Sequence, residues 1–353
     1  MKLGPRICTV IALLLVWCAA CGDNQPQNTG LVDGRAEAAT FDSVFAAADS
    51  VLLQQPDSAP IVRISGIDVD DHGRILIGDV SEGNVKLFAP DGRLIRIIGR
   101  KGAGPGEFTA PRYPRFGPQG LIYVADAQNP RVQVFDTSGT LRHSSPLAEV
   151  GLVMGFEPIT AATYLLTVEW VGNDRVLVEV DSAGKIRREF LGVGEVRPTG
   201  EGDSELWRNV RNFFLTVSHD TAYVSSTISD TLWTVHLPSG REARTRVVFP
   251  GYIRPSPPRD PPDGIQGLTA WSRSFHSGST LSSSGGALFL PFVQGVLNNA
   301  DPMLLLIRDG SGVWQVVSGA PPIIGAAHGR AIALLTPNQE QVRLGFFRLR
   351  DEP

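Results

Sequence analysis

A segment near the N-terminus recurs after 47 residues (79 to 126, and 92 to 139), and this repeat restricts the chain to few architectures. Gly73-Arg-Ile-Leu-Ile-Gly-Asp79 recurs as Gly120-Leu-Ile-Tyr-Val-Ala-Asp126. Asn84-Val-Lys-Leu-Phe-Ala-Pro-Asp-Gly92 recurs as Arg131-Val-Gln-Val-Phe-Asp-Thr-Ser-Gly139. Each unit alternates short β-branched runs with turns that contain Asp and Gly, which favour hairpins. A period of about 40–50 residues built from short strands is typical of a β-propeller, in which each repeat is one blade.

Similar strands continue along the chain with weaker likeness to the first unit, whose strands are expected at residues 64–69, 74–78, 85–88 and 93–98. The third strand of the unit and its turn recur as Val176-Leu-Val-Glu-Val-Asp-Ser-Ala-Gly184, Leu232-Trp-Thr-Val-His-Leu-Pro-Ser-Gly240, Leu304-Leu-Leu-Ile-Arg-Asp-Gly310 and the strand 342–350. Counted with the first two units, these give six such strands. After the first 40 residues about 310 remain, enough for about six blades at this period. The sequence therefore predicts an all-β, six-bladed β-propeller over residues 41–353.

The last blade lacks a strand in this scheme. No chain remains after the strand 342–350 for an outer strand, although a blade normally has four. An open sheet edge carries unpaired backbone groups, which a closed ring avoids. The apolar segment Phe41 to Leu53 precedes the first blade, and we predict that it supplies this N-terminal strand and closes the last blade.

The first 20 residues have the pattern of an export signal. Lys2 and Arg6 are followed by an apolar run of 11 residues, Ile7 to Trp17, and then by small residues. Eleven residues are too few to span about 30 Å of hydrocarbon. All three cysteines lie in the first 21 residues. The net charge of −4 gives no sign of a nucleic-acid partner.

Cys18-Ala-Ala-Cys21 resembles the bacterial lipobox, in which the last cysteine is acylated and becomes the N-terminus after cleavage. The alternative is an ordinary signal peptide that is cut near Ala20. The domain prediction is a lipoprotein signal peptide at residues 1–20, a disordered tether at 21–40 and the propeller at 41–353. The resemblance implies an exported protein of the cell envelope that is anchored to a membrane by the lipid on Cys21, facing the periplasm or the cell surface.

A second resemblance lies in the first two units. Ile98-Gly-Arg-Lys-Gly-Ala-Gly-Pro-Gly-Glu-Phe108, with Pro111, Ile122-Tyr-Val-Ala-Asp126 and Arg131-Val-Gln-Val-Phe135, resembles the NHL-repeat family and the secreted bacterial six-bladed propellers that share this connector. The resemblance implies architecture rather than a reaction. NHL-like propellers elsewhere bind proteins or nucleic acid, and related six-bladed folds include calcium-dependent lactonases and lyases.

Two motifs that suggest ligand sites have simpler structural interpretations. The glycines of 102–106 lack the following helix and the Gly-Lys-Ser/Thr that a phosphate loop needs, so we interpret the segment as a connector. Asp79 and Asp126 hold equivalent places in neighbouring units, where they are weak candidates for calcium ligands. A repeated Asp is more simply a turn residue that accepts backbone N–H bonds. The six histidines are scattered without metal-ligand spacing, and we expect no cofactor apart from this calcium alternative.

Arginine and aromatic residues gather in the segments between blades. Such connectors share one side of a propeller with the loops between second and third strands, and binding surfaces are enriched in these residue types. Arginine offers a bidentate fork to carboxylates, and tryptophan offers a stacking plane to sugars or peptides. The structural alternative is packing between blades. The same face is predicted to carry Tyr252, Arg254 and Arg259. The predicted binding residues on it are Arg100, Lys101, Arg112, Tyr113, Arg115, Trp170, Trp207, Arg208, Arg211 and Trp271.

Together these features predict a binding or scaffold module whose ligand is a protein, a peptide or a glycan, with no nucleic-acid partner. The alternative is an enzyme, a calcium-dependent lactonase-like or lyase-like protein with a metal at the central channel. Three or more convergent carboxylate or amide oxygens at the channel would favour the enzyme.

Overall fold

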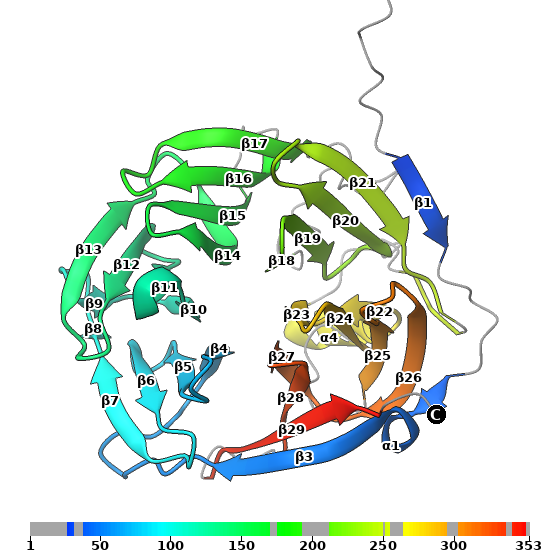
Figure 1. The fold of residues 1–353 in the computed structure, drawn as a ribbon, viewed down its shortest axis with the longest axis horizontal. Coiled ribbons are helices and arrows are strands. Elements are labelled where there is room, and N and C mark those ends of the chain that lie inside the picture. The colour runs from blue at the N-terminus through cyan, green and yellow to red at the C-terminus, as the bar shows by residue number, and fades with distance from the viewer. Residues whose placement is uncertain are drawn as a thin grey trace, which may run out of the picture.

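The computed structural model describes residues 27–31, 38–169, 175–192, 212–249, 251–254, 264–294, 303–336 and 341–350. In these residues strands dominate, and six sheets of four or more strands stand around one axis (Figure 1). The predicted all-β, six-bladed β-propeller is therefore confirmed.

Blades 1 to 3 are four-stranded antiparallel sheets whose strands follow chain order from the axis to the rim. Blade 1 contains β4 (Ile64–Val69), β5 (Ile75–Asp79), β6 (Asn84–Phe88) and β7 (Leu94–Ile98). Blade 2 contains β10 (Pro111–Phe116), β11 (Ile122–Asp126), β12 (Arg131–Phe135) and β13 (Leu141–Pro146). Blade 3 contains β14 (Leu152–Thr160), β15 (Thr163–Glu169), β16 (Arg175–Asp181) and β17 (Ile186–Gly192).

Blades 4 to 6 follow the same plan with one interrupted strand. Blade 4 contains β18 (Phe213–Ser218), β19 (Thr221–Ser226), β20 (Thr231–His236) and β21 (Arg241–Arg246). In blade 5 the inner strand is split into β22 (His276–Gly278) and β23 (Ser282–Ser284), which precede β24 (Ala287–Gln294), β25 (Met303–Arg308) and β26 (Trp314–Ala320). Blade 6 contains β27 (Ile323–Ala327), β28 (Arg330–Leu334), β29 (Arg343–Leu349) and β3 (Phe45–Leu52).

A few short elements connect or flank the blades. They are β1 (Gln27–Leu31), β2 (Ala39–Thr40), α1 (Phe41–Val44), β8 (Arg100–Lys101), β9 (Glu107–Phe108), η1 (Pro118–Gly120) and α4 (Gly264–Ser272).

The N-terminal strand closes the ring as the sequence predicts. β3 pairs antiparallel with β29 from Phe45↔Leu349 to Leu52↔Arg343 and forms the outer strand of blade 6. The preceding residues of the predicted segment form the short helix α1, whose Phe41 stacks on Phe45 with ring centroids 4.5 Å apart. Chain segments about 300 residues apart thus share one sheet, which leaves no blade open to its neighbour along this seam.

Two short strands lie within residues 21–40, the segment predicted as a tether. β1 pairs in parallel with β21 at the rim of blade 4, and β2 pairs in parallel with β26 at the rim of blade 5 (Figure 1). The physical reason is that each outer strand has one unpaired edge, and a passing polar segment can satisfy its N–H and C=O groups. Residues 21–26 and 32–37 lie outside the described residues.

The core lies between neighbouring blades, because each sheet is covered on both faces. β11 reads as an unbroken run, Ile122-Tyr-Val-Ala-Asp126, and all five residues are buried. Strands that are covered on both sides have such continuous runs rather than alternating ones. Between blades 2 and 3 the rings of Tyr123 and Tyr164 meet edge to face at 6.0 Å. The inter-blade layers make the ring rigid, and this rigidity fixes the positions of the loops on its two sides.

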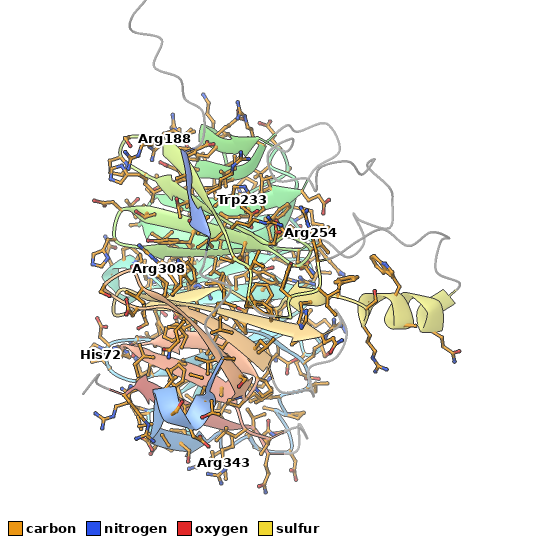
Figure 2. All side chains as sticks on the ribbon, turned by 90° about the vertical axis from the view of Figure 1, so that its right-hand side faces the viewer. His72, Arg188, Trp233, Arg254, Arg308 and Arg343 are labelled. Carbon is orange, nitrogen blue, oxygen red and sulfur yellow. The ribbon has the colours of Figure 1, made fainter. Side chains whose placement is uncertain are left out.

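Each strand crosses the ring from one side to the other, so the loops between strands fall into two sets, one on each side. We call the side with the blade-to-blade connections the connector face, and the side with the hairpins between first and second strands the hairpin face. Figure 2 shows the ring from its edge, with α4 and Arg254 on the connector face and His72 and Arg308 on the hairpin face. The position of each described residue therefore shows whether it lies on the predicted connector face.

Candidate functional site

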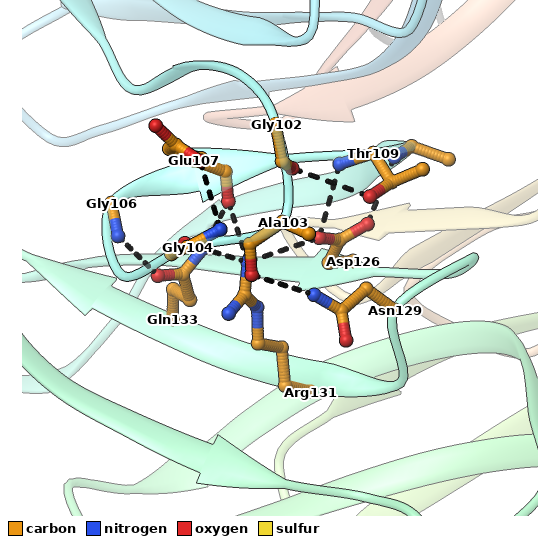
Figure 3. Close-up of polar contacts among 11 residues, drawn as sticks. Gly102, Ala103, Gly104, Gly106, Glu107, Thr109, Asp126, Asn129, Arg131 and Gln133 are labelled. Carbon is orange, nitrogen blue, oxygen red and sulfur yellow. Dashed lines mark hydrogen bonds and ion pairs between the residues drawn. The ribbon is translucent and has the colours of Figure 1, made fainter.

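The glycine-rich connector between blades 1 and 2 is a structural element (Figure 3). The N–H of Gly104 donates to Glu107 Oε2 at 2.9 Å, and the N–H of Gly106 donates to Gln133 Oε1 at 2.8 Å. Arg131 Nη2 donates to the carbonyls of Gly104 and Glu107 at 2.9 and 2.8 Å. Gly106 has a φ of +74°, a conformation that other residues rarely adopt. The predicted connector is confirmed, since these N–H groups bind protein acceptors and not a phosphate.

Asp79 and Asp126 fasten the chain that enters each blade to the end of the second strand. Asp126 accepts the N–H groups of Thr109 and Ala110 at 3.2 and 2.8 Å. In the same way Asp79 accepts the N–H groups of residues 62 and 63 at 2.8 and 3.2 Å, and it pairs with Lys86 Nζ at 3.2 Å. Both aspartates are fully buried. Their oxygens therefore serve the backbone, which is the structural interpretation that the sequence favours over calcium.

The predicted binding residues do not form one continuous patch. Arg100 and Lys101 are exposed on β8, where Arg100 Nη2 pairs with Glu107 Oε1 at 2.8 Å. Trp271 lies on α4 across the ring axis from β8, and it packs edge to face on Phe275 at 5.1 Å (Figure 1). The predicted residues Trp170, Trp207, Arg208, Arg211 and Arg259 lie outside the described residues.

Arg112, Tyr113 and Arg115 lie on β10, the innermost strand of blade 2, and not in a surface loop. The register of β10 against β11 shifts between Arg112 and Arg115, and Tyr113 within this bulge has a φ of +51°. Bulges redirect side chains. The Tyr113 hydroxyl donates to the carbonyl of Met154, and Arg115 Nε donates to Glu157 Oε1 at 3.0 Å. The prediction that Arg115 is an accessible binding residue is therefore corrected, because its guanidinium is mostly buried in an ion pair.

Three inner strands bring Asp68, Arg115 and Glu157 together in what we call the axial cluster. The N–H of Phe116 donates to Asp68 Oδ2 at 2.7 Å, and the side chains of Arg115 and Glu157 are 19% and 17% exposed. Burial raises the pKa of Glu157 to about 7, although the charge of Arg115 opposes this shift. Burial also raises the pKa of Asp68. Burial alone lowers the pKa of Arg115, but Glu157 and Asp68 outweigh it, so the net shift is upward and the guanidinium stays charged.

The axial cluster predicts a measurable pH dependence of stability. The pKa of Glu157 is about 7 in the folded protein, against an ordinary 4.5. Between pH 4.5 and pH 7 the folded state therefore keeps a proton on this carboxyl that the unfolded state has lost. This contribution to stability is fully present below pH 4.5 and is lost as the pH rises through 7. We expect wild type to lose up to about 3 kcal/mol more between pH 5 and pH 8 than Glu157→Gln, measured by urea unfolding. Glu189→Gln, an exposed change in the same blade, should follow wild type, and parallel pH profiles of wild type and Glu157→Gln would contradict the expectation.

A second cluster lies on the connector face, where blade 4 leads into blade 5; we call it the blade 4–5 patch. It consists of Asp230, Arg246, Tyr252, Arg254 and His276. Asp230 Oδ2 lies 2.9 Å from Arg246 Nε and 3.7 Å from Arg254 Nε. The ring of Tyr252 stacks on His276 with centroids 5.8 Å apart at 24°. The acid is 4% exposed, whereas both guanidinium side chains are about half exposed at 51% and 54%.

The polar atoms of the blade 4–5 patch are arranged as donors. The N–H of Ile253 donates to His276 Nδ1 at 2.9 Å, which leaves the proton of the neutral ring on Nε2. Burial lowers the pKa of His276 and so favours this neutral form. Burial, and next the charge of Asp230, raise the pKa of Tyr252, so its hydroxyl keeps its proton. Among the described residues this buried hydroxyl has no hydrogen-bond partner. Two half-exposed guanidinium groups and an imidazole N–H beside an aromatic face suit a ligand rich in oxygen acceptors.

Sequence reasoning found only part of this patch. Tyr252 and Arg254 were expected near the connector face, but Asp230, Arg246 and His276 were not identified. Asp230 lies in the loop before the third strand of blade 4, Arg246 ends the fourth strand, and His276 begins the first strand of blade 5, so no local motif links them. The one local signal is that Tyr252 lies three residues after Phe249, whose ring meets that of Tyr252 at 5.0 Å.

The described residues contain no group of three or more His, Cys, Asp or Glu side chains that could hold a metal ion. Near the axis they provide two carboxyl groups joined by an arginine, and not the three or more convergent oxygens that would favour the enzyme. Within the same residues no helix is both long and apolar enough to cross a membrane.

Comparison with known proteins agrees with the observed architecture. Residues 27–144 match a family model described as a 6-bladed beta-propeller, and this match runs from β1 through β3 and blade 1 into β13, the outer strand of blade 2. No curated protein matches the chain. The likeness to NHL repeats and the lipid anchor stay predictions.

Solved structures give the same result at low sequence identity. A Bacteroides fragilis protein described as exported has a TM-score of 0.64 at 15% identity, over 89% of this chain and 98% of that one. A member of the duf4221 family from Bacteroides vulgatus has a TM-score of 0.63 at 9% identity, over 87% and 98%. An inactive virginiamycin B lyase variant from Staphylococcus aureus, solved with quinupristin, has a TM-score of 0.50 at 11% identity, over 84% and 99%. At such identities the likeness concerns the fold alone.

Proposed function

We propose that this protein is an exported, lipid-anchored binding module that holds a protein, peptide or glycan on its connector face. The observation that carries the proposal is the blade 4–5 patch, in which half-exposed Arg246 and Arg254 flank a buried Asp230 next to the stacked pair Tyr252 and His276. Arginine and tyrosine around a desolvated centre are the residues that dominate binding energy at interfaces.

The chemistry of the patch favours an acidic or hydroxyl-rich ligand group. Arg254 Nε lies 3.7 Å from Asp230, beyond hydrogen-bond distance, so its guanidinium can turn to a ligand carboxylate without breaking a close bond. Arg246 holds Asp230 at 2.9 Å and keeps the buried acid paired during such a change. The exposed side chain of Ile253, at 45%, adds an apolar contact beside these donors.

The patch is tested by comparing variants on the two sides of the ring. Tyr252→Ala combined with Arg254→Ala should weaken capture of a ligand by about 30-fold or more, the loss expected for an interface hot spot. Arg308→Ala on the hairpin face is the matched control and should bind as wild type does. Binding is measured on glycan and acidic-peptide arrays and by photo-crosslinking in envelope fractions. Equal capture by wild type and the double variant, or an equal loss in the control, would contradict the proposal.

The export and anchor parts of the proposal rest on the signal-like residues 1–20 and on the lipobox-like Cys21. The similarity to a Bacteroides protein described as exported supports export. The calcium-dependent enzyme considered as the alternative gains no support from the described residues. Asp68 and Glu157 flank Arg115, and Asp79 and Asp126 bind backbone N–H groups.

A further inference from the structure

The path of the N-terminal segment restricts where a lipid on Cys21 can lie. β1 runs along the outer strand of blade 4, with Gln27 opposite Ala243, Asn28 opposite Arg244 and Leu31 opposite Arg246. Gln27 lies six residues after Cys21, and six residue steps span at most about 20 Å whatever path they take. An acyl chain on Cys21 is therefore confined to the neighbourhood of the blade 4 rim.

The stretch from Cys21 to Gln27 is too short to reach the far side of the ring. A compact chain of this length has a radius of gyration of about 20 Å, so opposite rims lie roughly 50 Å apart. Blade 1 lies across the axis from blade 4 (Figure 1). The rim of blade 1 carries the exposed apolar side chains Ile95 and Ile97, at 38% and 41%, which would be the competing candidate for contact with a bilayer. The anchor length argues against that rim.

The outermost strands next to the anchor are basic. β21 carries three arginines and one glutamate, and β17 of the neighbouring blade 3 carries two arginines and one glutamate. By contrast, β26 has no charged residue and β3 has one aspartate. The Glu242 carboxylate accepts the N–H of Leu191, which ties it to blade 3. Arg187 and Arg188 pair with Asp181 and Glu179 on β16, the neighbouring strand of blade 3. Their side chains nevertheless remain 55% and 41% exposed at the rim.

We infer that the rim of blades 3 and 4 is the surface that this protein turns toward the membrane, where arginines of β17 and β21 contact anionic lipid headgroups. The inference rests on the proposed acylation of Cys21. The acylated cysteine would hold this rim near the bilayer, and basic side chains near anionic headgroups would add electrostatic attraction. With this rim on the membrane the ring stands on its edge, and the connector face opens sideways to ligands instead of facing the bilayer.

The orientation is tested with single labels on the acylated protein. The chain has no cysteine after Cys21, so one introduced cysteine is a unique thiol once Cys21 is acylated. Arg244→Cys on β21 and Arg96→Cys on β7 form a matched pair, because both replace an exposed arginine within an outer strand. In vesicles with headgroup-nitroxide lipids, a fluorophore at 244 should be quenched at least twofold, and one at 96 should stay at the level without quencher. Equal quenching at both sites, stronger quenching at 96, or an intact mass showing no acyl chain on Cys21 would overturn the inference.

The charge contribution is tested separately without the lipid. Full-length Cys21→Ser protein should bind vesicles that contain phosphatidylglycerol and not pure phosphatidylcholine, and added salt should weaken this binding. Arg241→Gln with Arg244→Gln should lower the affinity by on the order of tenfold or more, at roughly fivefold per arginine. Arg93→Gln with Arg96→Gln on blade 1 should leave it unchanged, and an equal loss in both pairs would overturn the inference. Ligand capture by the blade 4–5 patch should persist in the Arg241 and Arg244 variant, so a failure of this inference is distinct from a failure of the proposed binding function.

Discussion

Replacing Asp79 with alanine is expected to lower the free energy of unfolding by about 3–5 kcal/mol, because it leaves the buried ammonium group of Lys86 without its ionic partner. Lys86 Nζ lies 3.2 Å from Asp79 Oδ2 and 2.9 Å from Asn84 Oδ1, and both charged side chains are 0% exposed. The same carboxylate accepts the N–H groups of residues 62, 63, 81 and 82. Without it, one ammonium and several N–H groups are left in the interior without their partner.

Urea unfolding of Asp79→Ala beside matched variants checks this expectation. Asp136→Ala removes a turn aspartate that is 20% exposed and pairs with Arg142, which is 58% exposed, so it should cost less than Asp79→Ala. Asp79→Ala combined with Lys86→Met removes both charges and should recover part of the lost free energy of unfolding. The reason is that removing one partner of a buried ion pair leaves an unpaired charge, whereas replacing both partners with apolar residues does not. A loss in Asp79→Ala no greater than in Asp136→Ala would show that the buried pair contributes little.

Removing the closing strand is expected to abolish folding of the isolated ring. β3 pairs with all seven residues of β29, and Phe41, Phe45, Val51 and Leu53 are each 2–9% exposed. At about 1.5–3 kcal/mol for each buried side chain, these four contribute roughly 6–12 kcal/mol. This is comparable to the whole stability of a typical protein, about 5–15 kcal/mol. The deletion also exposes the edge of β29 to other chains.

The experiment compares a chain that starts at residue 38 with one that starts at residue 55. The first retains β3 and should be soluble with a cooperative thermal transition, whereas the second should aggregate. A synthetic peptide of residues 38–54, added during refolding, should restore soluble protein, and a peptide with Phe45→Asp should not. If the chain from residue 55 folded cooperatively alone, the closing strand would be dispensable.

Much of the fold follows from local sequence. The 47-residue repeat, the Asp and Gly turns and the apolar runs specify short strands at a regular period, and each is encoded within about ten residues. The missing strand of the last blade follows from counting strands, because an unpaired edge is costly. The structural role of Asp79 and Asp126 was also predictable, since their equivalent places in two units indicate an architectural task.

The candidate site was less predictable, because it depends on contacts between distant segments. Connector position alone suggested that Arg115 is a surface residue, but the bulge in β10 places its guanidinium beside Glu157, 42 residues away. Asp230, Arg246 and His276 meet only because the inner strand of blade 5 packs beside blade 4.

By itself the sequence determined the class of fold, the number of blades and the strand that closes the ring, because strand rhythm and turn chemistry are local properties. Only the tertiary structure decided which side chains converge and where the N-terminal segment lies along the rim. Polar segments such as residues 27–31 carry no periodic signal, and their partners are free strand edges that exist only after the blades have formed.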